Sequence, residues 1–252
     1  MLARAALALL LVMLWLPIGQ HAFLVPHWMK VGTFIAPVLL YFCFAEGEGR
    51  AAYSGLRTLA VLMLVLYIVH QFEEHWLDVF GNEYAFYGAV NELLASALGQ
   101  DAAGFEVLTP ASIFVINTSL VWLVGLLAIE SAGTRRFPVL AMNGIILVNA
   151  ITHIVAAIIQ QAYNPGLLSA ALLFVPFALW FYHRALVVDG VPAQQAVASV
   201  IWALLAHVLM VGGLLGANWL RWYPEFLYFV ALVLWSLVPL ALFRGSTGQV
   251  EK

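Results

Sequence analysis

The sequence is poor in charged residues. Only 9% of its 252 residues are Asp, Glu, Lys or Arg, whereas a soluble domain carries about 25%. Hydrophobic residues make up 64%, and apolar runs of about 20 residues, long enough to cross roughly 30 Å of hydrocarbon, recur along the chain. This composition excludes an ordinary soluble domain. It predicts an all-α protein, a bundle of transmembrane helices that forms a single domain over residues 1–252.

Cysteine and clusters of basic residues are also scarce. The only cysteine, Cys43, lies within an apolar run, so one chain can build neither a disulfide framework nor a thiolate metal site. The formal net charge is −3, and without a basic cluster the chain lacks the electrostatic footprint of a nucleic-acid-binding protein. We therefore expect membrane lipids and a small hydrophobic substrate as partners, and no nucleic acid.

Apolar runs separated by polar breaks predict about eight spans. The second run is short, and a count of seven follows if it is only a partial span; a tilted helix there would start as early as Val25. The first run follows Arg4 as a signal sequence would, but no small-x-small cleavage site comes after it, which favours a retained span. The predicted spans are 5–24, 31–45, 55–78, 109–131, 137–161, 167–188, 194–217 and 225–243.

The distribution of basic residues predicts the orientation. With eight spans, one side carries most Arg and Lys residues and the other only Lys30 and Arg221, so the basic side and both termini are cytoplasmic by the positive-inside rule. The connection 79–108 contains acidic residues but no Lys or Arg, and we place it outside as a loop or interfacial helix. We expect a multi-pass protein of a bacterial inner membrane or a plasma membrane. The basic side holds Arg4, Arg50, Arg57, Arg135, Arg136, Arg184, Arg244 and Lys252.

The third predicted span ends in a cluster of ionisable side chains that begins with His70. A charged residue at mid-helix costs roughly 2.5–3.5 kcal/mol in a membrane, so such a cluster persists where it is paired, metal-bound or solvated. On a helix, His70, Glu73 and Glu74 share one face, Asp78 continues that stripe, and His75 points away from it. Three potential ligands therefore converge from one helix.

The fifth predicted span carries a second polar stripe, in which Asn149 lies four residues before His153. It ends in the tetrapeptide Tyr163-Asn-Pro-Gly166, whose proline and glycine favour a tight turn on the outer side. Asn117 and His207 add polar groups to two further apolar spans. All these positions fall in the outer half of their spans, so they can meet at one depth.

Imidazole and carboxylate groups together suit zinc, iron or manganese as the bound metal. We predict zinc or iron, with His70, Glu73, Glu74 and His153 as ligands, Glu73, Glu74 and Tyr163 as catalytic groups, and Asn117, Asn149 and His207 around them. Simpler interpretations exist. Glu73 and Glu74 can form a solvated acidic helix end, and the histidines and asparagines can serve only as hydrogen-bond partners between helices.

Three motifs in order resemble a known family of membrane proteins, the HXXEE-motif family. They are His70-Gln-Phe-Glu73-Glu74, the later His153, and Tyr163-Asn-Pro-Gly166. The resemblance covers roughly residues 55–188 and implies that His70, Glu73, Glu74, His153, Tyr163, Pro165 and Gly166 carry the shared function. It implies neither a particular reaction nor a cofactor.

Two functions from different classes fit these residues. The first is a membrane-embedded metal-dependent enzyme that acts on a lipid or other hydrophobic substrate; a metal-bound water favours hydrolysis, while an oxidoreductase would need iron and an electron source. The second is a proton- or ion-coupled transporter that uses the same His/Glu cluster. The absence of visible internal repeats counts against the transporter. An accessory subunit that binds a partner helix through the cluster ranks third.

Overall fold

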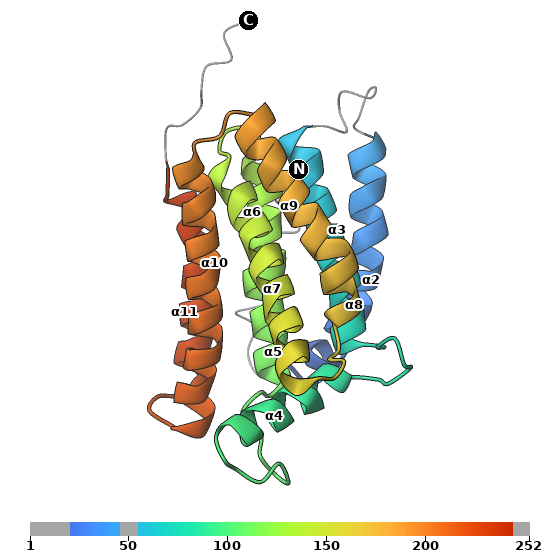
Figure 1. Cartoon of the computed structure of the whole chain (residues 1–252), viewed down its shortest axis with the longest axis vertical. Helices are drawn as coiled ribbons and strands as arrows, with labels where there is room; N and C mark the ends of the chain where they lie inside the picture. The colour runs from blue at the N-terminus through green and yellow to red at the C-terminus, as the bar shows by residue number, and fades with distance from the viewer. Residues whose placement is uncertain (1–20, 46–54, 244–252) are drawn as a thin grey trace, which may run out of the picture.

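The computed structural model describes residues 21–45 and 55–243, and this part of the chain is a bundle of helices (Figure 1). Within these described residues, five helical stretches are long and apolar enough to cross a membrane: Leu56–His75, Pro110–Ser131, Phe137–Gln160, Leu167–Val188 and Ala193–Trp219. Glu225–Leu240 is a shorter apolar helix. The expected third to eighth spans therefore correspond to helices whose ends lie within a few residues of the predicted ones.

The helices are α2 (His21–Ala45), α3 (Leu56–His75), α4 (Ala85–Ala97), α7 (Phe137–Gln160) and four composite helices. Three of the composite helices combine α-helical and π-helical segments. The fourth, α11, ends in a 3-10 turn. The four composite helices are α5-η3-α6 (Pro110–Ile116, Asn117–Leu123, Val124–Ser131), α8-η4-α9-η5 (Leu167–Ser169, Ala170–Phe174, Val175–His183, Arg184–Val188), α10-η6 (Ala193–Leu214, Leu215–Trp219) and α11-η7 (Glu225–Leu237, Val238–Leu240).

The helix α2 is longer than the short second span expected from the sequence. It begins at His21, ahead of the polar break at His27 and Lys30. Trp28 and Met29 are buried although they lie between these polar residues, and the Trp28 ring packs edge-on against Trp122. The polar residues His27 and Lys30 therefore lie within a continuous helix and do not mark its start. The predicted first span, 5–24, lies almost entirely outside the described residues.

The stretch Pro110–Ser131 is the most buried candidate span, with 94% of its most apolar window inside the protein. Thr109 starts it, because its hydroxyl accepts a hydrogen bond from the Ser112 amide while Pro110 occupies the first turn. α7 packs against α3, α6, α9 and α10. These contacts make Pro110–Ser131 and α7 the centre of the bundle, against which the site is built.

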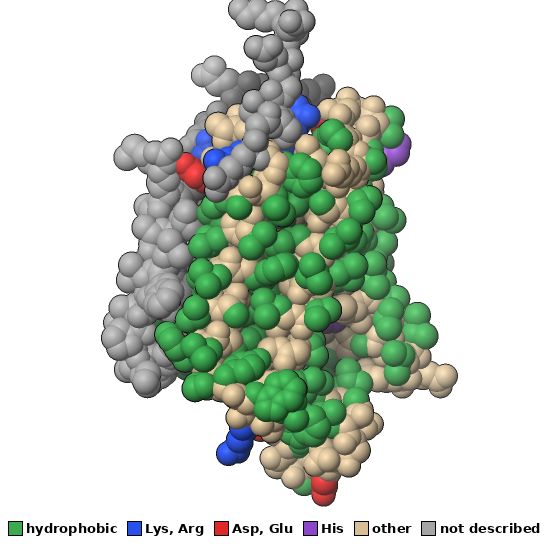
Figure 2. Space-filling model, turned by 90° about the vertical axis from the view of Figure 1, so that its left-hand side faces the viewer, with side chains coloured by type: hydrophobic (Ala, Val, Ile, Leu, Met, Phe, Trp, Pro, Cys, Tyr) green, Lys and Arg blue, Asp and Glu red, His purple; other side chains and the backbone are tan. Residues whose placement is uncertain are grey.

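The outer surface of the bundle is apolar, as lipid contact requires. Large hydrophobic side chains stay exposed along the helices, including Val155, Ile158, Leu172, Val187 and Val208. Figure 2 shows this green belt, with Lys, Arg, Asp and Glu side chains gathered toward the two ends. The protein is therefore built as a membrane protein, since a soluble one would not expose so much apolar surface.

The connection between α3 and the next long helix folds over one end of the bundle, here named the α4 end (Figure 1). Asn91 on α4 is buried and holds the chain that follows, because its carbonyl accepts hydrogen bonds from the Val107 and Leu108 amides. Its amide group donates to the Leu108 carbonyl. This connection thus contains the helix α4, which is tied to the bundle; its position outside the membrane stays a prediction.

Candidate metal centre

Three ionisable side chains meet inside the bundle near the α4 end: His70 and Glu74 from α3, and His153 from α7. One possible ligand atom from each lies within 4.8 Å of the others, and all three side chains are buried. His70 is five residues from the end of α3 and His153 seven from the end of α7, which places them about 8 and 10 Å inside their helix ends. The two polar stripes therefore meet inside the bundle; their depth in the membrane stays a prediction.

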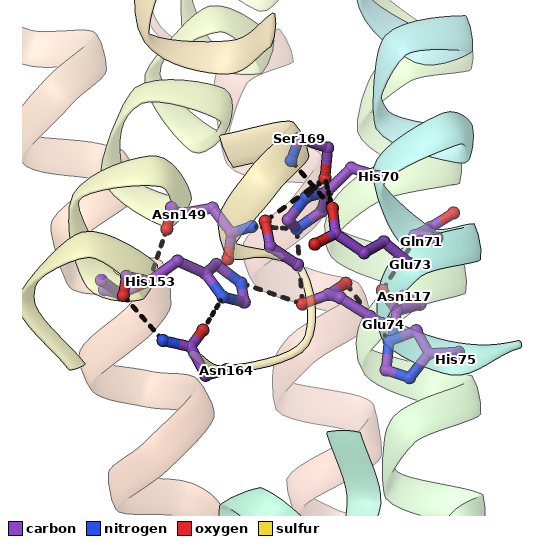
Figure 3. A network of polar contacts seen from close by, with 12 residues as sticks. His70, Gln71, Glu73, Glu74, His75, Asn117, Asn149, His153, Asn164 and Ser169 are labelled. Atoms are coloured by element: carbon purple, nitrogen blue, oxygen red, sulfur yellow. Dashed lines mark hydrogen bonds and ion pairs between the residues drawn. The ribbon is translucent and has the colours of Figure 1, made fainter. Parts of the chain in front are cut away.

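Glu74 is the centre of this arrangement (Figure 3). Its Oε1 lies 3.0 Å from His153 Nε2 and 3.4 Å from His70 Nε2. Its Oε2 lies 3.4 Å from His75 Nε2. One carboxylate therefore faces three imidazole nitrogens. His75 was expected to point away, but it is buried beside Glu74 because adjacent helix positions on either side of a stripe both reach inward in a tightly packed bundle.

The second nitrogen of each ligand histidine has a partner that fixes the tautomer. His153 Nδ1 lies 2.7 Å from Asn164 Oδ1, and Asn164 is itself held by a hydrogen bond from its amide to the His153 carbonyl. His70 Nδ1 lies 2.7 Å from the Ser169 hydroxyl, whose hydrogen is donated to Glu73. Both Nδ1 atoms therefore act as donors, and in the neutral rings both Nε2 atoms carry a lone pair. That of His153 faces Glu74, while that of His70 accepts a hydrogen bond from the Asn149 amide and lies 3.4 Å from Glu74.

Glu73 does different work from its neighbour Glu74. Its two oxygens accept hydrogen bonds from the Tyr163 hydroxyl, the Leu168 amide, and both the amide and the hydroxyl of Ser169. It thereby caps the start of the helix Leu167–Val188, where unpaired amides attract a carboxylate. Glu73 lies outside the three-residue group that could hold an ion.

Three of the four residues in the turn after α7 contact the site. Tyr163 binds Glu73 and Asn164 binds His153. Gly166 has φ +95°, and a Cβ there would lie 2.7 Å from His153 Cε1 and 2.8 Å from His70 Cε1. Only glycine allows the backbone to lie so close over the two rings. The pKa of the Tyr163 phenol is raised above its ordinary value, because partial burial and the nearby Glu73 carboxylate both disfavour the phenolate.

The remaining predicted site residues lie around this cluster. Asn149 Nδ2 is 2.8 Å from His70 Nε2. Asn117 donates to His75 Nε2 over 3.1 Å and accepts a hydrogen bond from Gln71. His207 Nδ1 donates to the Ala203 carbonyl, and its ring lines a cavity that also touches Glu74.

Sequence reasoning missed two partners of the histidines, Asn164 and Ser169. The sequence pattern marks Asn164 only as part of a turn and predicts no role for Ser169. A signal for Ser169 was present, since a serine three residues after Gly166 lies in the first turn of the next helix, where hydroxyl groups often serve as local hydrogen-bond partners. Asn164 offered no such signal, because asparagine is common in turns for reasons unrelated to a ligand.

Comparison with known proteins identifies a family but no activity. No curated protein and no solved structure shows significant similarity to the chain. A family model described as "protein of unknown function with HXXEE motif" matches residues 61–181, the segment that contains His70, Glu73, Glu74, His153 and the turn. The segment that builds the candidate metal centre is therefore the part of the chain that is similar to the HXXEE-motif family of unknown function.

Proposed function

We propose that the protein is a membrane-embedded metal-dependent enzyme whose ion is held by His70, Glu74 and His153. One observation carries this proposal. His153 Nε2 and Glu74 Oε1 lie 3.0 Å apart, while the Nδ1 proton of the ring is directed to Asn164. A lone pair and a carboxylate at this distance repel each other unless a positive charge lies between them. A metal ion would supply that charge, and it would take the lone pair of His70 Nε2 in place of the hydrogen bond from the Asn149 amide.

The donor set fits a catalytic ion. Two imidazoles and one carboxylate are a common ligand set for catalytic zinc, which keeps a fourth position for water or substrate. Tetrahedral ligands at about 2.1 Å from zinc lie about 3.4 Å apart, close to the observed 3.0 and 3.4 Å. The partners of both Nδ1 atoms are those expected around metal-bound histidines. Bound there, an ion would polarise a substrate carbonyl and acidify a water, which supports hydrolysis more directly than oxidation.

The surroundings support a hydrophobic substrate and a site in the outer half of the bilayer. A mainly apolar cavity borders Glu74, and the helices around it present apolar side chains to lipid. The basic residues Arg135, Arg136 and Arg184 lie at helix ends remote from the α4 end. By the positive-inside rule, the end of the bundle that carries these arginines is cytoplasmic. The α4 end is then on the outer side, and the cluster near it lies in the outer half of the bilayer.

Metal analysis of purified protein tests the proposal. Wild-type protein, supplied during expression with zinc or with iron, should contain a near-stoichiometric amount of one of them. His70→Ala, His153→Ala and Glu74→Gln should lose it. The matched control is His183→Ala, because this histidine is exposed at the end of α9 and remote in sequence from the three ligands. Folded, monodisperse wild-type protein without metal after either supplement would refute the metalloenzyme.

The same short contact favours a second candidate, a proton-coupled transporter. A separation of 3.0 Å between His153 Nε2 and Glu74 Oε1 is also a hydrogen-bond distance, so a proton can take the place of the ion. In that case the purified protein contains no metal, and proteoliposomes show a proton flux that Glu74→Gln abolishes. Metal in the wild type together with an absence of proton flux rejects the transporter.

A further inference from the structure

A cavity of about 110 Å³ lies beside the candidate metal centre and includes Glu74 in its wall. Its other walls come from α3, α4, α5-η3, α7 and α10, and most of the lining side chains are apolar. At about 10–15 Å³ for each water-sized group, this space takes on the order of seven to eleven such groups. That is room for one alkyl chain segment, and too little for the two chains of a phospholipid.

The cavity reaches the lipid-facing surface of the bundle. Val211 on α10 belongs to the cavity wall and is also 42% exposed. Val208, one turn away on the same helix, is 66% exposed and does not line the cavity. Figure 2, which views the bundle from the side of α10 and α11, shows a hollow in the lower half of this face with a histidine side chain visible inside. A ligand can therefore enter sideways from the membrane.

The polar groups on the cavity wall select a particular kind of head group. None of the described residues that line the wall is Lys or Arg, so none of them neutralises a phosphate or a fatty-acid carboxylate. It does contain hydrogen-bond acceptors. Glu74 is one, and His207 is another, since its Nδ1 donates to the Ala203 carbonyl and leaves Nε2 with a lone pair. Acceptors in an apolar cavity bind a ligand that brings its own donor, such as a hydroxyl group.

The apolar part of the wall is completed by α4. Phe86, Val90 and Leu94 follow one face of this helix and line the cavity, which closes the space at the α4 end. Because Asn91 ties α4 to Val107 and Leu108, this cover is held in place. The chain segment of the ligand is therefore enclosed between α4 and α10, with its polar group near Glu74.

We propose that this cavity binds a single-chain, uncharged lipid that carries a hydroxyl group and enters from the bilayer past Val211. His207 Nε2 accepts the hydrogen bond of that hydroxyl group, and the alkyl chain lies against α4 and α10. The inference deepens the proposed function, because it takes this lipid to be the substrate class of the metal centre. It makes His207 a residue that determines specificity and leaves the metal ligands unchanged.

Photo-crosslinking tests the inference with two probes of equal chain length, a photoactivatable long-chain alcohol and the corresponding fatty acid. In the wild type, the alcohol should label peptides from α4 and α10 more strongly than the acid does. Val211→Trp fills the entrance and should reduce this labelling to background. Val208→Trp is the matched control on the same helix and should label as the wild type does. His207→Leu should weaken alcohol binding roughly 2- to 10-fold, the loss of one hydrogen bond.

Two results would overturn the inference: equal labelling of α4 and α10 in the wild type and Val211→Trp, or labelling by the acid as strong as by the alcohol. Metal content measured in the same samples separates this inference from the proposed function. Specific alcohol labelling of a metal-free protein leaves the cavity as a lipid site and rejects the metalloenzyme. Metal-loaded protein without labelling rejects the lipid site alone.

Discussion

Replacing Gly166 with alanine should damage the site through packing. A Cβ at this position would lie 2.7 Å from His153 Cε1, 2.8 Å from His70 Cε1 and 2.9 Å from Glu74 Cγ, so all three candidate ligands must move. Overpacking of this kind costs about 1–3 kcal/mol, and an alanine at φ +95° costs about 1–2 kcal/mol more. The expected loss of stability is therefore about 2–5 kcal/mol.

Gly190→Ala is the matched control for Gly166→Ala. Gly190 also has positive φ, +62°, but a Cβ there meets nothing within 4 Å, so only the backbone cost of about 1–2 kcal/mol applies. Thermal unfolding in detergent, followed by tryptophan fluorescence, measures the difference between the variants, and metal analysis follows the site. The metal affinity of Gly166→Ala should also be at least about tenfold lower than that of Gly190→Ala. If both variants unfold alike and keep their metal, the close packing of Gly166 on the ligands is refuted.

Two further predictions concern hydrogen bonds around the site. Ser169→Ala removes the partner of His70 Nδ1 and should weaken metal affinity about 10- to 100-fold; unchanged affinity in a metal titration would show that this hydroxyl group does not orient the ring. The pKa of Asp78 is lowered, since burial opposes its charge but hydrogen bonds from Asn82 and the Phe80 amide outweigh that effect. The ionised Asp78 carboxylate therefore stabilises the folded loop at pH values above the ordinary carboxyl pKa of about 4. This contribution is lost as the pH falls below that value and through the lowered pKa. Proteolysis of the 78–82 loop should accelerate only in that acidic range, and Asp78→Asn should remove the pH dependence.

The helices could be predicted from the sequence to a large extent, because hydropathy reports directly the length of an apolar run that can cross a membrane. Six predicted spans have helices at nearly the same positions. The predictions were weakest where polar side chains interrupt a helix, as at Lys30 in α2. The backbone of a helix in a membrane satisfies its own hydrogen bonds whatever its side chains are, so a polar residue there need not mark an end. The count of spans and the location of the termini stay predictions.

The choice of His70, Glu74 and His153 as neighbours followed from sequence, because helical periodicity places residues on a face and polar groups in a membrane seek partners. The different tasks of the two glutamates did not follow from it. Adjacent helix residues point about 100° apart, and which of them faces α7 depends on how the helices are rotated against each other. That rotation results from packing of the whole bundle, and local sequence does not encode it.

The geometry connects the two adjacent glutamates of this chain to a distant turn. Glu74 reaches the imidazole nitrogens, and Glu73 holds Tyr163 and Ser169, which lie on either side of the glycine that covers the ligand rings. The second glutamate of the pair thus binds the ion in our proposal, and the first binds the segment that closes over it. Glu73→Gln keeps all three proposed ligand atoms but loses acceptor strength at the turn. Because its effect passes through the turn, it should loosen metal binding less than Glu74→Gln, which changes a ligand itself.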